Sequence, residues 1–205
     1  MRYRVVEGPS GQDHLGSSAT SLLPGRKQDD DLTRPHARAT GKFDVARART
    51  DESLAIWREL GDRQNTANVL STAARLARDE GQFALARARL AESLQILKDL
   101  GDRRGIAFVL EGFAGLAADE AQPFRAQCLA ASAATLRRMI GAGPPPAWRA
   151  DLERSLEAAS RGVRRDAIEE SNARGRSMTL PEAIAFALEE PSPPRASPEP
   201  NGAEW

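Results

Sequence analysis

The chain has 205 residues, of which 29 are basic and 29 acidic, so it lacks the positive excess of a dedicated nucleic-acid binder. Apolar residues make up 40% and aromatic residues only 5%, a composition that favours helices over strands. A single cysteine excludes a disulfide within the chain, and no run approaches the roughly 18 apolar residues of a membrane span. With no apolar signal-peptide region at the start, we expect a cytoplasmic protein without a membrane partner. The preference for Arg over Lys, with abundant Ala, Gly and Pro, indicates a bacterial source.

The two ends of the chain differ in composition from its middle. Residues 1–40 contain Gly, Pro, Ser and charged side chains without a periodic apolar face, and residues 191–205 are rich in Pro, Ser and Glu. Such segments bury too little apolar surface to offset the entropy lost on ordering. We therefore predict a disordered head and a disordered tail.

An internal repeat begins at residue 41. Residues 41–80 and 81–120 are identical at 22 of 40 aligned positions. A period of this length in a helix-favouring sequence predicts stacked pairs of helices. Gly61 and Asp62 divide the first period, because Gly ends helices and Asp accepts hydrogen bonds from the first N–H groups of the next one. The predicted helices are 43–60, 63–80, 83–100 and 103–120.

A degraded third copy follows, and the repeats are predicted to extend over residues 41–141. The run Gly143-Pro144-Pro145-Pro146 then breaks the pattern. Residues 142–190 are predicted to form C-terminal capping helices, at about 147–160 and 163–174 and in a last helix. That last helix begins at a capping box made by Thr179 and Glu182.

Several residues carry a resemblance to known repeats. Gly81, Phe83 and Ala86 fall where tetratricopeptide repeats keep a Gly, an aromatic residue and an Ala. The phrase from Glu92 to Asp102 resembles the long-period repeats at the C-terminal end of bacterial signalling ATPases, including LuxR-type transcriptional regulators. The resemblance covers about residues 41–189. It implies an all-α fold, a tetratricopeptide-like α-solenoid of antiparallel helix pairs.

The resemblance does not extend to the catalytic or DNA-binding parts of such regulators. The chain contains no G-x-x-x-x-G-K-[ST] phosphate loop, and no basic recognition helix follows the final helix. Only a sensing or docking module is therefore implied, possessing neither ATPase activity nor direct nucleic-acid binding.

Side chains with catalytic potential are few. His14 and His36 both lie in the predicted disordered head, and Cys128 is expected to be buried and inert. Paired carboxylates recur at the predicted helix ends 79–80 and 119–120, where we expect solvated termini. The Arg pairs of the repeats alternate with Glu and Asp, which predicts a face of salt bridges. We predict no enzyme, no metal and no cofactor.

The predicted function is non-catalytic binding of a protein or peptide segment. Stacked helix pairs form a concave surface from the first helix of each pair, here helices 63–80 and 103–120. We call the side of these two helices that forms the concave surface the inner face. The inner-face positions are Asn68, Ser71, Arg75, Arg78, Phe108, Glu111 and Asp119. The alternative is a small-molecule effector-sensing domain with a pocket between helices.

The N-terminal end of the repeat is predicted to lack a packing partner. Helix 43–60 corresponds to the second member of a pair whose first member is absent from the repeat pattern. We expect Val45, Ile56 and Trp57 to leave apolar surface exposed there, and the chain to self-associate through this end.

Overall fold

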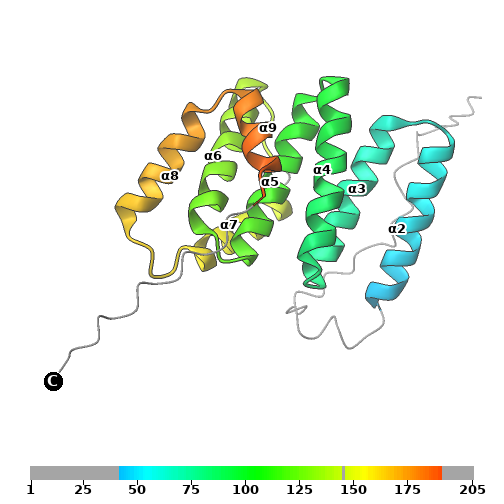
Figure 1. Cartoon of the computed structure of the whole chain (residues 1–205), viewed down its shortest axis with the longest axis horizontal. Coiled ribbons are helices and arrows are strands. Elements are labelled where there is room, and N and C mark those ends of the chain that lie inside the picture. Colours follow the sequence, from blue (N-terminus) through cyan, green and yellow to red (C-terminus); the bar gives the residue numbers. More distant parts are fainter. Residues whose placement is uncertain (1–41, 145, 191–205) are drawn as a thin grey trace, which may run out of the picture. The chain divides into compact units, whose positions relative to one another are not determined.

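The computed structural model describes residues 42–144 and 146–190, and the regular structure in this part of the chain is entirely α-helical (Figure 1). The helices are α2 (Lys42–Glu59), α3 (Arg63–Asp79), α4 (Phe83–Leu100), α5 (Arg103–Asp119), α6 (Pro123–Met139), α7 (Pro146–Ala159), α8 (Arg165–Ser177) and α9 (Leu180–Leu188). This confirms the all-α prediction. The predicted head, and the tail from residue 191, lie outside the described residues.

Helices α2 to α5 begin and end within one residue of the predicted positions. Gly61 and Gly101 have a left-handed backbone with φ of 67°. The Asp62 carboxylate accepts a hydrogen bond from the Asn65 backbone N–H at 2.9 Å, which caps α3 and lowers the pKa of Asp62. The capping box of Thr179 and Glu182 is formed at the start of α9.

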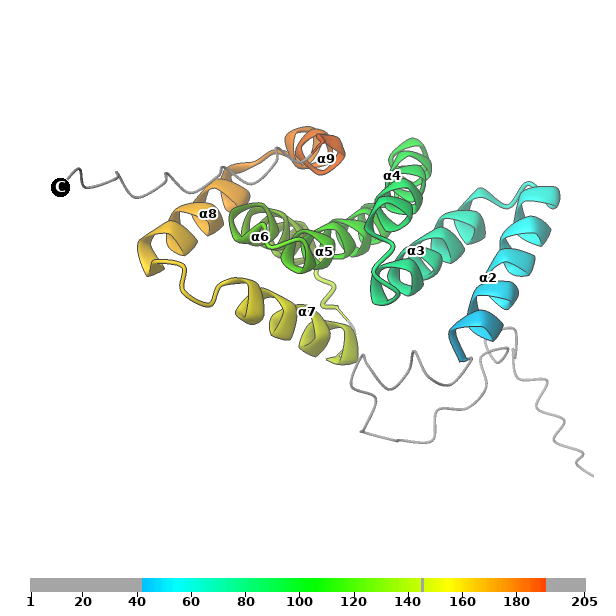
Figure 2. The same ribbon diagram turned by 60° about the horizontal axis from the view of Figure 1, so that its bottom comes forward.

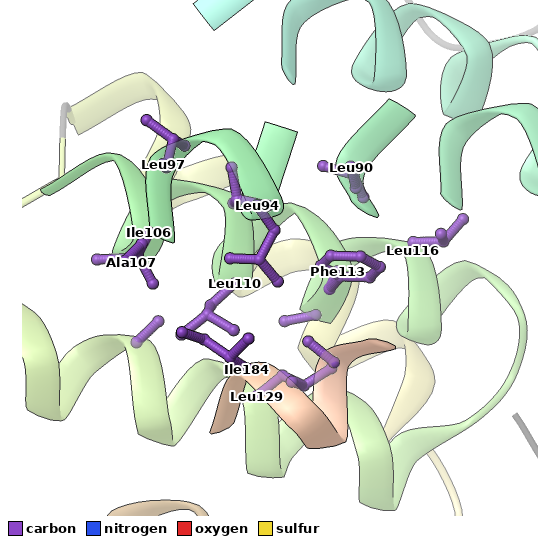
Figure 3. Packing of buried hydrophobic residues seen from close by; sticks show 14 of the residues in the cluster. Leu90, Leu94, Leu97, Ile106, Ala107, Leu110, Phe113, Leu116, Leu129 and Ile184 are labelled. Carbon is purple, nitrogen blue, oxygen red and sulfur yellow. The ribbon is translucent and has the colours of Figure 1, made fainter. Parts of the chain in front are cut away.

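The packing of the repeat helices matches the predicted pairing. Helix α3 packs most extensively against α4, and α5 against α6, whereas α2 contacts α3 and α4 contacts α5 over smaller surfaces. Helix α2 therefore stands as the second member of a pair. Figure 3 shows the core between α4, α5, α6 and α9, where Leu94, Leu110, Phe113, Leu129 and Ile184 lie together.

Polar contacts repeat with the same spacing along the stacked helices. Arg47 pairs with Glu80, and 40 residues further on Arg87 pairs with Glu120. These carboxylates were predicted to be solvated helix ends, and that prediction is wrong. The Glu80 and Glu120 side chains are only 11% and 16% exposed, because the neighbouring repeat helix covers them with an Arg. Arg47 and Arg87 form salt bridges as predicted, but the Arg87–Glu120 pair is largely buried and is not part of a solvent-exposed face.

The stacking order changes after α6. Helix α7 packs mainly against α5 and little against α6, whereas α8 packs extensively against α6. Gly175 of α8 permits this approach, because a Cβ there would collide with the Cys128 carbonyl oxygen of α6. Helix α8 begins at Arg165, two residues later than predicted. The result is that α7 leaves the stack and lies along one side of α5 (Figure 2).

Helix α9 occupies the opposite side of α5 and α6 from α7 (Figure 2). Arg125 of α6 secures its C-terminal end by donating hydrogen bonds to the carbonyl oxygens of Phe186 and Glu189, each at 2.7 Å. Burial lowers the pKa of Arg125. Among the described residues, no helix is both long and apolar enough to cross a membrane.

Candidate partner-binding face

The α3 part of the predicted inner face divides into exposed and buried positions. Asn68 is exposed, and the Arg75 side chain is 41% exposed beside Asp79. Ser71 is buried, and its hydroxyl lies 2.9 Å from the Ser93 hydroxyl of α4. Ser71 therefore belongs to the contact between α3 and α4, and of the predicted positions discussed here Asn68 and Arg75 have accessible side chains.

Arg78, near the C-terminal end of α3, joins three helices. Its Nε donates to the Asp119 carboxylate of α5 at 2.8 Å, and its Nη2 donates to the Ser155 hydroxyl of α7 at 3.2 Å. The Arg78 side chain is 4% exposed and that of Asp119 is 10% exposed. A second carboxylate from α7, that of Asp151, lies 3.7 Å from Nη2. Two predicted inner-face residues are thus in contact with each other, and Arg78 also contacts α7.

Gly115 of α5 makes room for the Arg78 guanidinium. A Cβ at this position would collide with the Arg78 Nη1. Gly costs about 1 kcal/mol relative to Ala inside a helix, so its presence here has a packing reason. The same holds for Gly112, whose Cβ would lie 2.8 Å from a methyl carbon of Leu90.

Glu111 lies at the centre of a buried polar cluster on α5. Its carboxylate accepts two hydrogen bonds from the Arg137 guanidinium of α6, one of them at 2.8 Å. The same Glu111 Oε2 accepts a hydrogen bond from the Trp148 indole N–H of α7, also at 2.8 Å. The side chains of Glu111 and Arg137 are 4% and 7% exposed. The pair gives both carboxylate oxygens of Glu111 a donor, and α7 adds a third contact.

Phe108 lies one turn before Glu111 on α5. Its ring stacks on the Trp148 ring, with centroids 4.4 Å apart and an angle of 28° between the planes. Trp148 therefore makes an apolar contact with Phe108 and a polar contact with Glu111. This is the arrangement expected of an indole at a protein–protein contact, where one end is apolar and the other needs an acceptor.

Three predicted inner-face residues thus contact α7, namely Arg78, Phe108 and Glu111, and Asp119 is linked to it through Arg78. The sequence did not reveal Trp148 and Ser155 as their partners, because both lie outside the repeated region, and it did not link Arg137 of the degraded third copy to Glu111. Gly115 was an available signal, but only for the close approach of Arg78 to α5.

The single cysteine lies between α6 and α8. The Cys128 thiol is buried and donates to the Ser171 carbonyl oxygen at 3.1 Å, and burial raises its pKa. This confirms the prediction of a buried cysteine. Within residues 42–144 and 146–190, no group of three or more His, Cys, Asp or Glu side chains is placed to hold a metal ion. The two histidines lie outside the described residues.

The outer side of α2 exposes apolar surface as predicted. Val45 is 58% exposed and Ile56 is 48% exposed, while Trp57 is half-buried. Self-association through this surface remains a prediction.

A tetratricopeptide repeat family model matches residues 36–99, which include α2, α3 and nearly all of α4. The chain therefore contains a tetratricopeptide-like repeat region, and repeats of this class generally mediate protein–protein interactions without catalysis. Among curated proteins and among solved structures, no significant match to the chain is found.

Proposed function

We propose that this protein is a non-catalytic interaction module that binds a helical segment of another protein on the inner face of α3 and α5. One observation carries the proposal: the inner face already holds a helix, α7, through an aromatic stack, an indole hydrogen bond and contacts to a buried guanidinium. A surface that binds a helix from its own chain has the shape and the polar groups to bind one from another chain.

The charged groups of the inner face have partners within the repeat helices themselves. Arg78 is paired with Asp119, and Glu111 is paired with Arg137, both within the repeat helices. These pairs hold the charged groups in place before a partner arrives, which lowers the entropic cost of binding.

The small-molecule alternative finds less support. A depression between α2, α3 and α4, lined by residues that include Arg47, Thr50 and Leu85, has an empty volume of about 220 Å³ that includes open solvent. Sites for drug-sized ligands usually enclose about 300–1,000 Å³ and bury most of the ligand. We therefore retain the protein partner as the proposed function.

We further propose that the module is the detached C-terminal repeat region of an ATPase-type transcriptional regulator. The support is the similarity of the phrase from Glu92 to Asp102 to the repeats of such regulators. The neighbouring DNA tests this: an in-frame or frameshifted ATPase segment upstream is expected, and an unrelated gene there would refute it.

Site-specific photo-crosslinking in the native host tests the partner-binding function. A benzoylphenylalanine at Asn68 places the reactive group on the accessible part of the inner face. The matched control is the same group at Gln95, which is exposed on α4, the second helix of the pair. We expect a discrete crosslinked protein from position 68 and not from position 95. Equal patterns from both positions, or none from position 68, would refute the proposal.

A further inference from the structure

Helix α7 differs from the other helices around α5 in how it is held. None of its residues is buried, whereas most residues of α5 are. Its contacts come from one stripe of side chains. Trp148 and Ser155 bond to polar groups, Leu152 packs against the main core, and Leu156 and Ala159 pack against the small cluster of Ala117, Ala118 and Ala126. The residues between these, such as Glu153 and Arg154, are exposed.

The segments on either side of α7 connect it to the stack without helical structure. It is preceded by Gly143 and Pro144, which are outside regular structure, and followed by Gly162 with φ of 80°. The extensive contacts of α6 beyond α5 are made by α8 and not by α7. Removal of α7 therefore leaves the pairs α3–α4 and α5–α6 and the α6–α8 contact in place.

The inner face would stay electrostatically satisfied after such a release. The Arg78–Asp119 and Glu111–Arg137 pairs do not include α7. The groups newly exposed to solvent are one face of Phe108, one lone pair of the Glu111 Oε2, the Arg78 Nη2 and the apolar surface beneath Leu152, Leu156 and Ala159. Each of these can be contacted again by a helix of the same pattern.

We propose that α7 is an exchangeable occupant of the inner face, and that it is displaced by an amphipathic helix of a partner protein with matching chemistry. That helix carries an indole for Phe108 and Glu111 and, one turn later, a carboxylate for Arg78, as Trp148 and Asp151 do in α7. This inference rests on the proposed function. It adds the chemical class of the partner and the presence of an internal competitor.

The spacing of the contacts explains why a helix is required. Residues 148, 152, 155 and 159 follow the i, i+4, i+7, i+11 pattern of one helical face. An extended peptide alternates its side chains with a period of two and cannot bring an indole, a carboxylate and a hydroxyl to the same side at these separations.

The test uses the full chain and a fluorescein-labelled peptide with the sequence of residues 146–160, with binding read by fluorescence anisotropy. In the wild-type chain α7 competes with the peptide, and because it is tethered it acts at a millimolar effective concentration. The wild-type chain should therefore bind the peptide weakly. The Trp148→Ala chain, whose own α7 is weakened, should bind it at least about tenfold more tightly. The Glu153→Ala chain, altered on the exposed side of α7, should behave as wild type.

A peptide with Ala in place of its Trp should lose binding to the Trp148→Ala chain. The exchange proposal is overturned if that chain keeps its helical circular dichroism yet binds the unmodified peptide no better than wild type. It is also overturned if the variant forms dimers by light scattering in place of a peptide complex, because the occupant would then be a second copy.

Hydrogen exchange on the wild-type chain provides a measurement that does not depend on a variant. The backbone amides of α7 should exchange at least about tenfold faster than those of α5 and α6. The reason is that α7 can detach and unfold while the stacked helices stay folded. Equal protection of α7 and α5 would overturn the proposal. If α7 and α5 are equally protected but position 68 gives a discrete crosslinked protein, the exchange of α7 is refuted and the proposed interaction function is retained.

Discussion

The buried pair of Glu111 and Arg137 gives the sharpest test of the energetics around α5. Replacing Glu111 with Ala leaves the Arg137 guanidinium, with only 7% of its side chain exposed, without its carboxylate, and it removes the acceptor of the Trp148 indole. Removing one partner of a buried ion pair usually costs about 3–5 kcal/mol. In a domain of this size that corresponds to a Tm decrease of roughly 6–20 °C. Urea and thermal unfolding followed by circular dichroism at 222 nm measure both quantities.

Two further variants decide whether the buried charge is the cause. In the double variant Glu111→Leu, Arg137→Met, no charge is left unpaired, and most of the lost stability should return. Glu92→Ala removes a carboxylate from the solvent-exposed pair with Arg58 and should cost less than about 1 kcal/mol. If Glu111→Ala costs no more than Glu92→Ala, the reasoning about the buried pair is refuted.

Three other predictions concern packing, pH and association. Gly115→Ala should destabilise the fold by about 1–3 kcal/mol in urea unfolding, because the new methyl group collides with Arg78; a gain in stability would mean that helix propensity outweighs the collision. Asp62 has a lowered pKa, so it stabilises the folded state above its unfolded pKa of about 3.9 and loses this contribution as the pH falls below that value. The Asp62→Asn variant should therefore lose less Tm than wild type between pH 5 and pH 3, and parallel curves would contradict the capping argument. The variant Val45→Glu, Ile56→Glu should reduce concentration-dependent association measured by light scattering, and a wild-type chain that stays monomeric at high concentration would exclude this surface as a contact.

The repeat part of the fold could be predicted from local signals. A left-handed Gly and a capping Asp act within a few residues of their own positions, so Gly61 and Asp62 fixed the boundary between α2 and α3. Because the sequence repeats every 40 residues, the next helix pair has the same boundaries and the same packing. The capping box at Thr179 placed α9 for the same local reason.

The position of α7 was decided only by tertiary structure. Its amphipathic stripe predicts a helix but does not say which surface will cover that stripe, and the repeat pattern placed it among the capping helices at the C-terminal end. Arg78 contacts Ser155 across 77 residues, and the indole of Trp148 contacts Glu111 across 37. No local rule connects positions so far apart. The inner face was therefore identifiable as a set of positions in the sequence, but its occupation by α7 depends on the space left by Gly115 and on the larger surface that α8 covers on α6.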